Sequence, residues 1–161
     1  MSKPLSGFEV ELLGAIAYGF KFKDAPLASM TLEVNRHLFA QDAPSLEQLQ
    51  DLHEDYDPEV EPIISFYTTQ GQGVQPSSSR GGRAEWNLKI NLRAGAVFED
   101  AKGLLEQLVA FLDRLRGRRL AGFLLKGVIM VSRPTPFTRA IDDGAVSQAS
   151  VKLMAVPVPT R

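Results

Sequence analysis

The chain of 161 residues contains no cysteine and only two histidines, His37 and His53. Without cysteine it cannot form disulfide bonds, thiolate metal sites or a cysteine nucleophile. Neither histidine stands at a zinc-type spacing from other donor residues. These absences leave few side chains suited to catalysis or to metal binding, and we expect neither a catalytic residue nor a metal ligand.

Long hydrophobic runs are also missing. No window approaches the roughly 18 apolar residues that a membrane helix needs, and the apolar stretch at residues 8–18 is interrupted by Glu9 and Glu11. We therefore expect a soluble protein that is not exported by a cleaved signal. A chain of this length has the ordinary size of one domain, which predicts a single domain over residues 1–161.

Motifs for nucleotide binding and hydrolysis are absent from the sequence. There is no G-x-x-x-x-G-K phosphate loop, and the serines at 77–79 have no nucleophile-elbow pattern around them. The carboxylates between His53 and Glu61 could hold a hard cation, but they lack the glycine-punctuated loop of a calcium site. The alternative is a solvated acidic face. Together these observations predict a protein that is not an enzyme and binds no cofactor.

The C-terminal half alternates between the periodicities of strands and helices. Apolar residues recur at every second position in some stretches and at every third or fourth position in others. The elements predicted from these patterns are a strand over 85–93, a helix over 99–116, a strand over 123–131, a turn at Asp143 and Gly144, and a last strand from 145 to about 154. Pro134 and Pro136 are expected to interrupt sheet pairing because proline has no backbone N–H to donate.

The N-terminal half gives weaker signals. Its clearest pattern is a capping box at Ser45 and Gln48, whose side chains can each satisfy the other residue's backbone N–H. The helix that starts there should point Leu46, Leu49 and Leu52 inward. The predicted elements are a helix over 6–17, a second helix candidate over 27–39, a short helix from Ser45 to about Glu54, and a strand over 63–69.

The fold class predicted from these elements is α+β. We expect a mostly antiparallel sheet of about four strands, with the long helix at about 99–116 packed on one face and the N-terminal helices beside it. Residues 70–83 are rich in glycine and serine and are predicted to form a flexible loop. Arg80 and Arg83 within it suit non-specific contact with a phosphate backbone, although a solvated loop tip is the alternative.

Charge is distributed unevenly along the chain. Residues 41–62 contain eight acidic residues and no basic one, whereas residues 114–133 contain six basic residues and no acidic one. The two blocks are either solvated faces or the two sides of a head-to-tail contact between subunits. The residues that we assign to such a contact are Asp51, Glu54, Asp55, Asp57, Arg114, Arg116, Arg118 and Arg119. The arginines also have a local explanation, because positive charge is favoured at the end of a helix.

The C-terminal half resembles a known family. An alternating strand, a helix and an apolar strand are followed by the runs RPTPF (residues 133–137) and IDDGAV (141–146), which lead into SQASVKL (147–153). This order over residues 84–156 resembles that of the tail terminator, or tail completion, proteins of long-tailed bacteriophages. In that family a proline-containing segment and an Asp-containing turn ending in glycine precede a last strand of similar alternation.

The resemblance implies a structural protein of the virion. Proteins of this family form a sixfold ring that caps the head-proximal end of the tail tube, stops its growth and faces the connector of the head. The expected partners are further copies of the chain in a homohexameric ring, the tail tube protein, the head–tail connector or adaptor protein, and DNA passing through the lumen, without a membrane. The loop at 70–83, with Arg80 and Arg83, would line the lumen or reach a neighbouring ring. Assembly would occur in the host cytoplasm.

Two other interpretations remain open. The first is another head–tail adaptor or a tail tube protein, which would belong to the same particle. The second is a small ligand-binding α+β module or an enzyme subunit, which would have a defined pocket with convergent polar groups.

Overall fold

The computed structural model describes residues 7–25, 27–70, 84–95, 101–120, 122–136 and 146–157. Within these residues, three α-helices and one short 3-10 helix accompany a six-stranded sheet. In chain order the elements are α1 (Gly7–Gly19), η1 (Leu27–Ser29), β1 (Leu38–Ala40), α2 (Leu46–Leu52), β2 (Ile63–Gln70), β3 (Ala84–Arg93), α3 (Ala101–Asp113), β4 (Arg119–Leu120), β5 (Phe123–Pro136) and β6 (Val146–Pro157).

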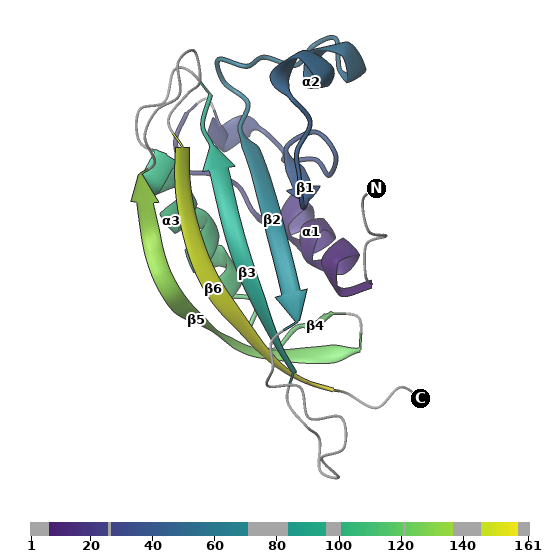
Figure 1. Cartoon of the computed structure of the whole chain (residues 1–161), viewed down its shortest axis with the longest axis vertical. Coiled ribbons are helices and arrows are strands. Elements are labelled where there is room, and N and C mark those ends of the chain that lie inside the picture. The colour runs from purple at the N-terminus through teal and green to yellow at the C-terminus, as the bar shows by residue number, and fades with distance from the viewer. Residues whose placement is uncertain are drawn as a thin grey trace.

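The sheet is mixed and strongly curved. Its strand order is β1-β2-β3-β6-β5-β4; β1 runs parallel to β2, and the other neighbouring pairs are antiparallel. Figure 1 shows β5 and β6 bending along their length, so that the sheet curls into half of a barrel. In this view α3 lies behind the sheet and α1 lies beside it, while α2 stands at the upper end of the molecule.

The predicted sheet of about four strands with one long helix across it is therefore wrong. Strands β2, β3, β5 and β6 follow the predictions, but β1 and β4 were not predicted. They contain three and two residues, which is too short for an alternating pattern to be recognised. Each forms only by pairing with a longer strand, β1 with β2 and β4 with β5.

The second helix predicted over 27–39 is also wrong. The chain makes one 3-10 turn at η1 and then runs to β1 through a turn in which Asn35 has a φ of 71°. A left-handed residue at that position ends any helix. The helix over 6–17 is confirmed as α1, and the strand over 63–69 as β2.

Three boundaries in the C-terminal half differ from the predictions, one of them the end of β6, which runs to Pro157 rather than to about 154. Helix α3 ends at Asp113 rather than at 116, because the chain tightens into i→i+3 bonds and then reaches Gly117, whose φ is 88°. Strand β5 does not stop before Pro134 and Pro136. It continues to Pro136, with three shifts of its register against β6. The shift between Ser132 and Thr135 leaves Pro134 without a register partner, as a bulge allows for a proline, whereas Pro136 lies opposite Ser147 as the last residue of the strand.

The main core lies between the sheet and the helices α1 and α3. Alternate residues of β2, β3 and β6 point into it, among them Ile64, Ile90 and Val151. Trp86, which the sequence places in register with the strand's apolar face, is buried and meets the ring of Phe123 edge-on at 4.7 Å. A second, smaller cluster lies under α2 and consists of Phe39, Leu49, Tyr56 and Ile63, with Ala43 and Leu46 packed against it.

Candidate interaction surfaces

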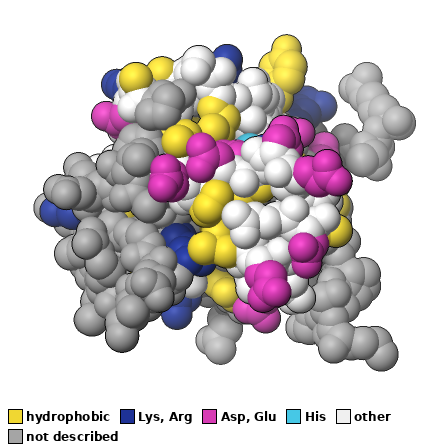
Figure 2. Space-filling model, turned by 90° about the horizontal axis from the view of Figure 1, so that it is seen from above, with side chains coloured by type: hydrophobic (Ala, Val, Ile, Leu, Met, Phe, Trp, Pro, Cys, Tyr) yellow, Lys and Arg dark blue, Asp and Glu magenta, His cyan; other side chains and the backbone are white. Residues whose placement is uncertain are grey.

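The acidic residues predicted from the sequence gather at the end of the molecule that carries α2. The exposed side chains of α2 and of the segment after it form an acidic surface, which consists of Glu47, Asp51, Glu54, Asp55, Asp57 and Glu59. Figure 2 looks onto this end and shows Asp and Glu side chains standing around exposed hydrophobic side chains. Helix α2 begins at the predicted capping box, in which Ser45 Oγ accepts from the Gln48 N–H at 3.2 Å and Gln48 Oε1 accepts from the Ser45 N–H at 2.9 Å.

One acidic residue of the block, Glu61, is buried beneath this surface. Its carboxylate accepts two hydrogen bonds from Arg36, from Nε at 2.7 Å and from Nη2 at 3.0 Å. His37 Nε2 lies 2.7 Å from the same carboxylate, and the backbone N–H of Asp57 donates to it at 2.6 Å. Four donors satisfy the acceptor sites of a carboxylate. Burial acts to raise the pKa of Glu61, but the bonds from Arg36, Asp57 and His37 outweigh it and lower the pKa.

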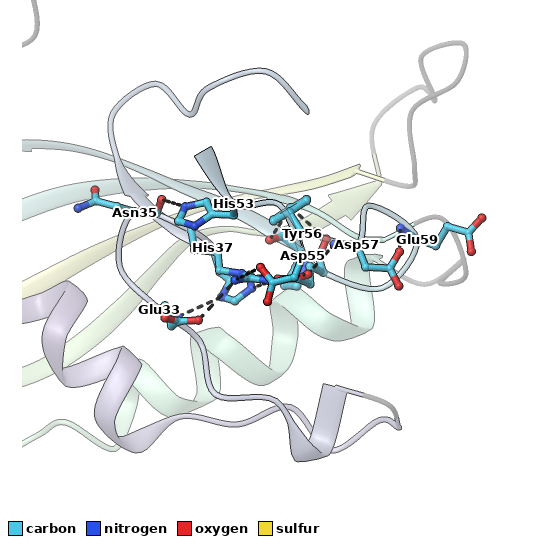
Figure 3. Close-up of polar contacts among 11 residues, drawn as sticks. Glu33, Asn35, His37, His53, Asp55, Tyr56, Asp57 and Glu59 are labelled. Carbon is cyan, nitrogen blue, oxygen red and sulfur yellow. Dashed lines mark hydrogen bonds and ion pairs between the residues drawn. The ribbon is translucent and has the colours of Figure 1, made fainter. Parts of the chain in front are cut away.

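The hydrogen bonds of His37 define its tautomer. Its Nδ1 accepts from the backbone N–H of Glu33 at 3.0 Å (Figure 3), so the ring proton resides on Nε2 and is donated to Glu61. The side chain is buried, and burial lowers the pKa of His37 even though Glu61 acts in the opposite direction. Both ring nitrogens are engaged, and His37 is therefore a neutral structural group rather than a free acid or base.

This buried network holds the segment that carries much of the acidic surface. Arg36 also pairs with Asp55 at 3.0 Å, and its guanidinium lies 5.8 Å from the centre of the Tyr56 ring. Gly95, just after β3, packs so closely that a Cβ atom there would lie 2.5 Å from the carbonyl oxygen of Glu59. Asp55 is thus partly neutralised within the chain. Asp51 and Glu54 have no ion-pair partner in the described part of the chain.

The four predicted arginines lie together where α3 ends and β4 begins. Arg114, Arg116, Arg118 and Arg119 are exposed, while the intervening Leu115 and the following Leu120 are buried. Backbone bonds tie this turn to β5, from the Gly117 N–H to the Leu125 carbonyl at 2.8 Å and from the Leu125 N–H to the Arg118 carbonyl at 2.9 Å. We call the four arginines the basic end.

Pairing within the basic end is slight. Arg116 lies 3.5 Å from Asp113, and both side chains are well exposed. Among the described residues, Arg118 and Arg119 have no ion-pair partner. Their positive charge is consequently available to a group outside the chain.

The acidic surface and the basic end lie far from each other. Figure 1 is drawn with the longest axis of the molecule vertical, and it shows α2 at the top and β4 at the bottom. The structure therefore brings the four predicted carboxylates together and the four arginines together, but it does not bring the two sets into contact within one chain. Of the predicted loop at 70–83, Gln70 belongs to β2, and the remaining residues, Arg80 and Arg83 among them, lie outside the described residues. The predicted turn at Asp143 and Gly144 also lies outside them.

An open groove beside α2 is a feature that the sequence did not predict. It has a volume of about 490 Å³ and is lined by Asp42, Ala43, Pro44, Gln48, Asp51 and Leu52. Leu52, which was expected to point inward with Leu46 and Leu49, is 68% exposed. Successive residues three apart on a helix drift by about 60° around its axis. Because Leu49 lies at the centre of the contact between α2 and the smaller cluster, Leu52 at the end of the helix faces the solvent.

The hydrogen-bond network around Glu61 was also not predicted from the sequence. Arg36 and Glu61 are 25 residues apart in sequence, and no spacing rule connects them. Within the described ranges, no three His, Asp or Glu residues are close enough to hold a metal ion. No described helix is long and apolar enough to cross a membrane.

The chain was compared with known proteins. No family model matches it, and no curated protein matches its sequence.

Proposed function

We propose that this chain is the tail terminator of a long-tailed bacteriophage, a virion protein whose ring caps the head-proximal end of the tail tube and joins it to the head connector. The proposal rests first on the resemblance over residues 84–156. The order strand, helix, strand, strand on which it depends corresponds to β3, α3, β5 and β6, with the two-residue β4 inserted between α3 and β5.

The single observation that carries the proposal is the separation of opposite charge to the two ends of one molecule. A ring of identical subunits needs two different, complementary surfaces on each subunit. The acidic surface at α2 and the basic end at β4 meet this requirement. A heterologous contact of this kind closes into a ring when the rotation between subunits closes, and otherwise extends into a filament.

The other partners follow from the same role. A terminator contacts the tail tube protein on one side and the head–tail connector or adaptor on the other, and DNA passes through its lumen. The protein would be assembled in the host cytoplasm and remain in the virion. No step of this role needs catalysis or a cofactor.

The direct test is negative-stain microscopy of lysates made with a phage that lacks the gene. A missing terminator leaves tube growth unchecked, so we expect tails longer than normal beside filled heads that have no tail. Expression of the gene from a plasmid should restore tails of normal length. Lysates without any tails would indicate a tube protein, and normal virions would reject the proposal.

A further inference from the structure

We propose that the groove beside α2 is the seat for the basic end of a second copy of this chain, with Arg118 and Arg119 placed between Asp42 and Asp51 and over Leu52. The inference deepens the function proposed above, since it rests on self-assembly and names the contact that would perform it. The occupant is a second copy of this chain.

The groove has the composition of a contact site. Its apolar part consists of Ala43, Pro44 and Leu52, and its polar rim of Asp42, Gln48 and Asp51. Leu52, which is 68% exposed, lines the groove together with Ala43 and Pro44, so the exposed apolar surface is a small patch rather than one isolated side chain. An apolar centre with a charged rim is the usual anatomy of a protein–protein interface.

The walls of the groove are held in place from below. Helix α2 rests on the cluster of Phe39, Leu49, Tyr56 and Ile63. On the opposite wall, Asp42 Oδ1 accepts a hydrogen bond from the Tyr67 hydroxyl at 3.0 Å. A preorganised site loses less conformational entropy when it is filled, so the groove is suited to be an acceptor.

The identity of the occupant is argued from charge complementarity. The rim carboxylates favour a cationic partner, and Arg118 and Arg119 of the basic end are exposed and have no ion pair within the described residues. An arginine can lie with its aliphatic stem on a leucine while its guanidinium meets carboxylates. Because the two features are at opposite ends of the molecule (Figure 1), one chain cannot satisfy itself. A second copy can.

Charge exchange tests the pairing. Asp51→Arg or Arg118→Asp alone should weaken self-association by on the order of ten-fold or more at low salt, as measured by analytical ultracentrifugation. The double variant Asp51→Arg/Arg118→Asp should recover most of the loss, because the charges are again opposite. Glu11→Lys, a reversal of an exposed residue on α1, is the matched control and should leave association unchanged.

The absence of cysteine offers an independent readout. We expect chains with Asp51→Cys to form disulfide-linked dimers when mixed with chains carrying Arg118→Cys. A mixture of Glu11→Cys and Arg118→Cys should yield few. The two mixtures share the Arg118→Cys chain, so their comparison reports which position lies beside Arg118 in the assembled pair.

The outcomes separate this inference from the proposed function. Loss on single reversal, recovery in the double variant and selective cross-linking support the contact, whether the particle formed is a ring or a filament. Reversals without effect, a double variant that does not recover, or unselective cross-linking overturn it. If the occupant of the groove were instead a cationic partner from another protein, the purified chain would be monomeric throughout and the reversals would have no effect on its association. Overlong tails in the gene deletion with no effect of the reversals would retain the function and reject the groove.

Discussion

At the scale of single residues, Glu61 explains why an acidic segment can be rigid. A buried carboxylate is costly unless it is paired and hydrogen-bonded, and here Arg36, His37 and the Asp57 N–H all donate to it. The consequence is that three parts of the chain, around residues 36, 57 and 61, are held together by one side chain.

The tautomer of His37 predicts how stability depends on pH. Its pKa is lower in the folded chain than the ordinary value of 6.5, so the unfolded chain takes up the proton first as the pH falls. The contribution of neutral His37 to the free energy of unfolding is therefore complete above pH 6.5 and decreases progressively below it. Protonation of Nδ1 would also place two donors face to face, since the Glu33 N–H already points at it. We expect the free energy of unfolding to fall between pH 7 and pH 5.5, by at most about 1.4 kcal/mol for each pH unit, measurable by urea unfolding.

The control for this prediction is the second histidine of the chain. His37→Gln should flatten the dependence on pH over this interval, whereas His53→Gln should keep it, because His53 lies against the Asn35 carbonyl and outside the Glu61 network. An unchanged slope in His37→Gln would show that His37 is not the titrating group.

At the scale of elements, the acidic segment is docked onto the end of β3 through a glycine. A Cβ atom at Gly95 would meet the backbone of Glu59 and Val60 at 2.5 to 2.6 Å, so Gly95→Ala must displace one of the two segments. We expect a loss of about 2 kcal/mol in the free energy of unfolding.

Gly14 provides the opposite control. It lies within α1, and nothing lies within 4 Å of the position of an added Cβ atom. Alanine favours a helix interior by about 0.5 to 1 kcal/mol over glycine, so Gly14→Ala should stabilise the chain. Equal effects of the two substitutions in a denaturant titration would contradict the packing described for Gly95.

The elements that the sequence revealed are those with a local cause. Strand β3 alternates over a length sufficient for the period to be read, β2 is rich in the β-branched and aromatic residues that suit a strand, and the capping box of α2 involves residues three apart. Strands β1 and β4 have no such signal, because each exists only through its partner. The bulges of β5 are likewise a property of its register against β6, which a single strand's pattern does not contain.

The candidate interface was predictable in part. Charge blocks are visible in a sequence, and the exposed positions of Asp51, Glu54 and the four arginines agree with the expectation. The placement of the acidic and basic residues at opposite ends depends on the long-range fold and could not be predicted from the sequence. The groove was not predicted because helical spacing assigns Leu52 to the buried face of the helix. In the structure α2 ends at Leu52, and this side chain lines the groove instead.

At the scale of the whole molecule, the proposed association of copies depends on the acidic surface and the basic end rather than on the net charge of −1. Exposed charges interact over about 10 Å at 0.1 M salt. A contact built on them is therefore strongest at low ionic strength, while the apolar contact at Leu52 would persist at higher salt. Assembly through these ends should weaken, but not vanish, as salt is added.

The central claim is that copies of this chain join end to end into a closed ring. Native mass spectrometry of the purified chain at low ionic strength tests it most directly. We expect one dominant hexamer whose share does not grow into larger species as concentration rises, and which dissociates toward monomers as the ionic strength of the sample before spraying is raised. A monomer at every concentration, or a ladder of masses that lengthens with concentration, would contradict the ring.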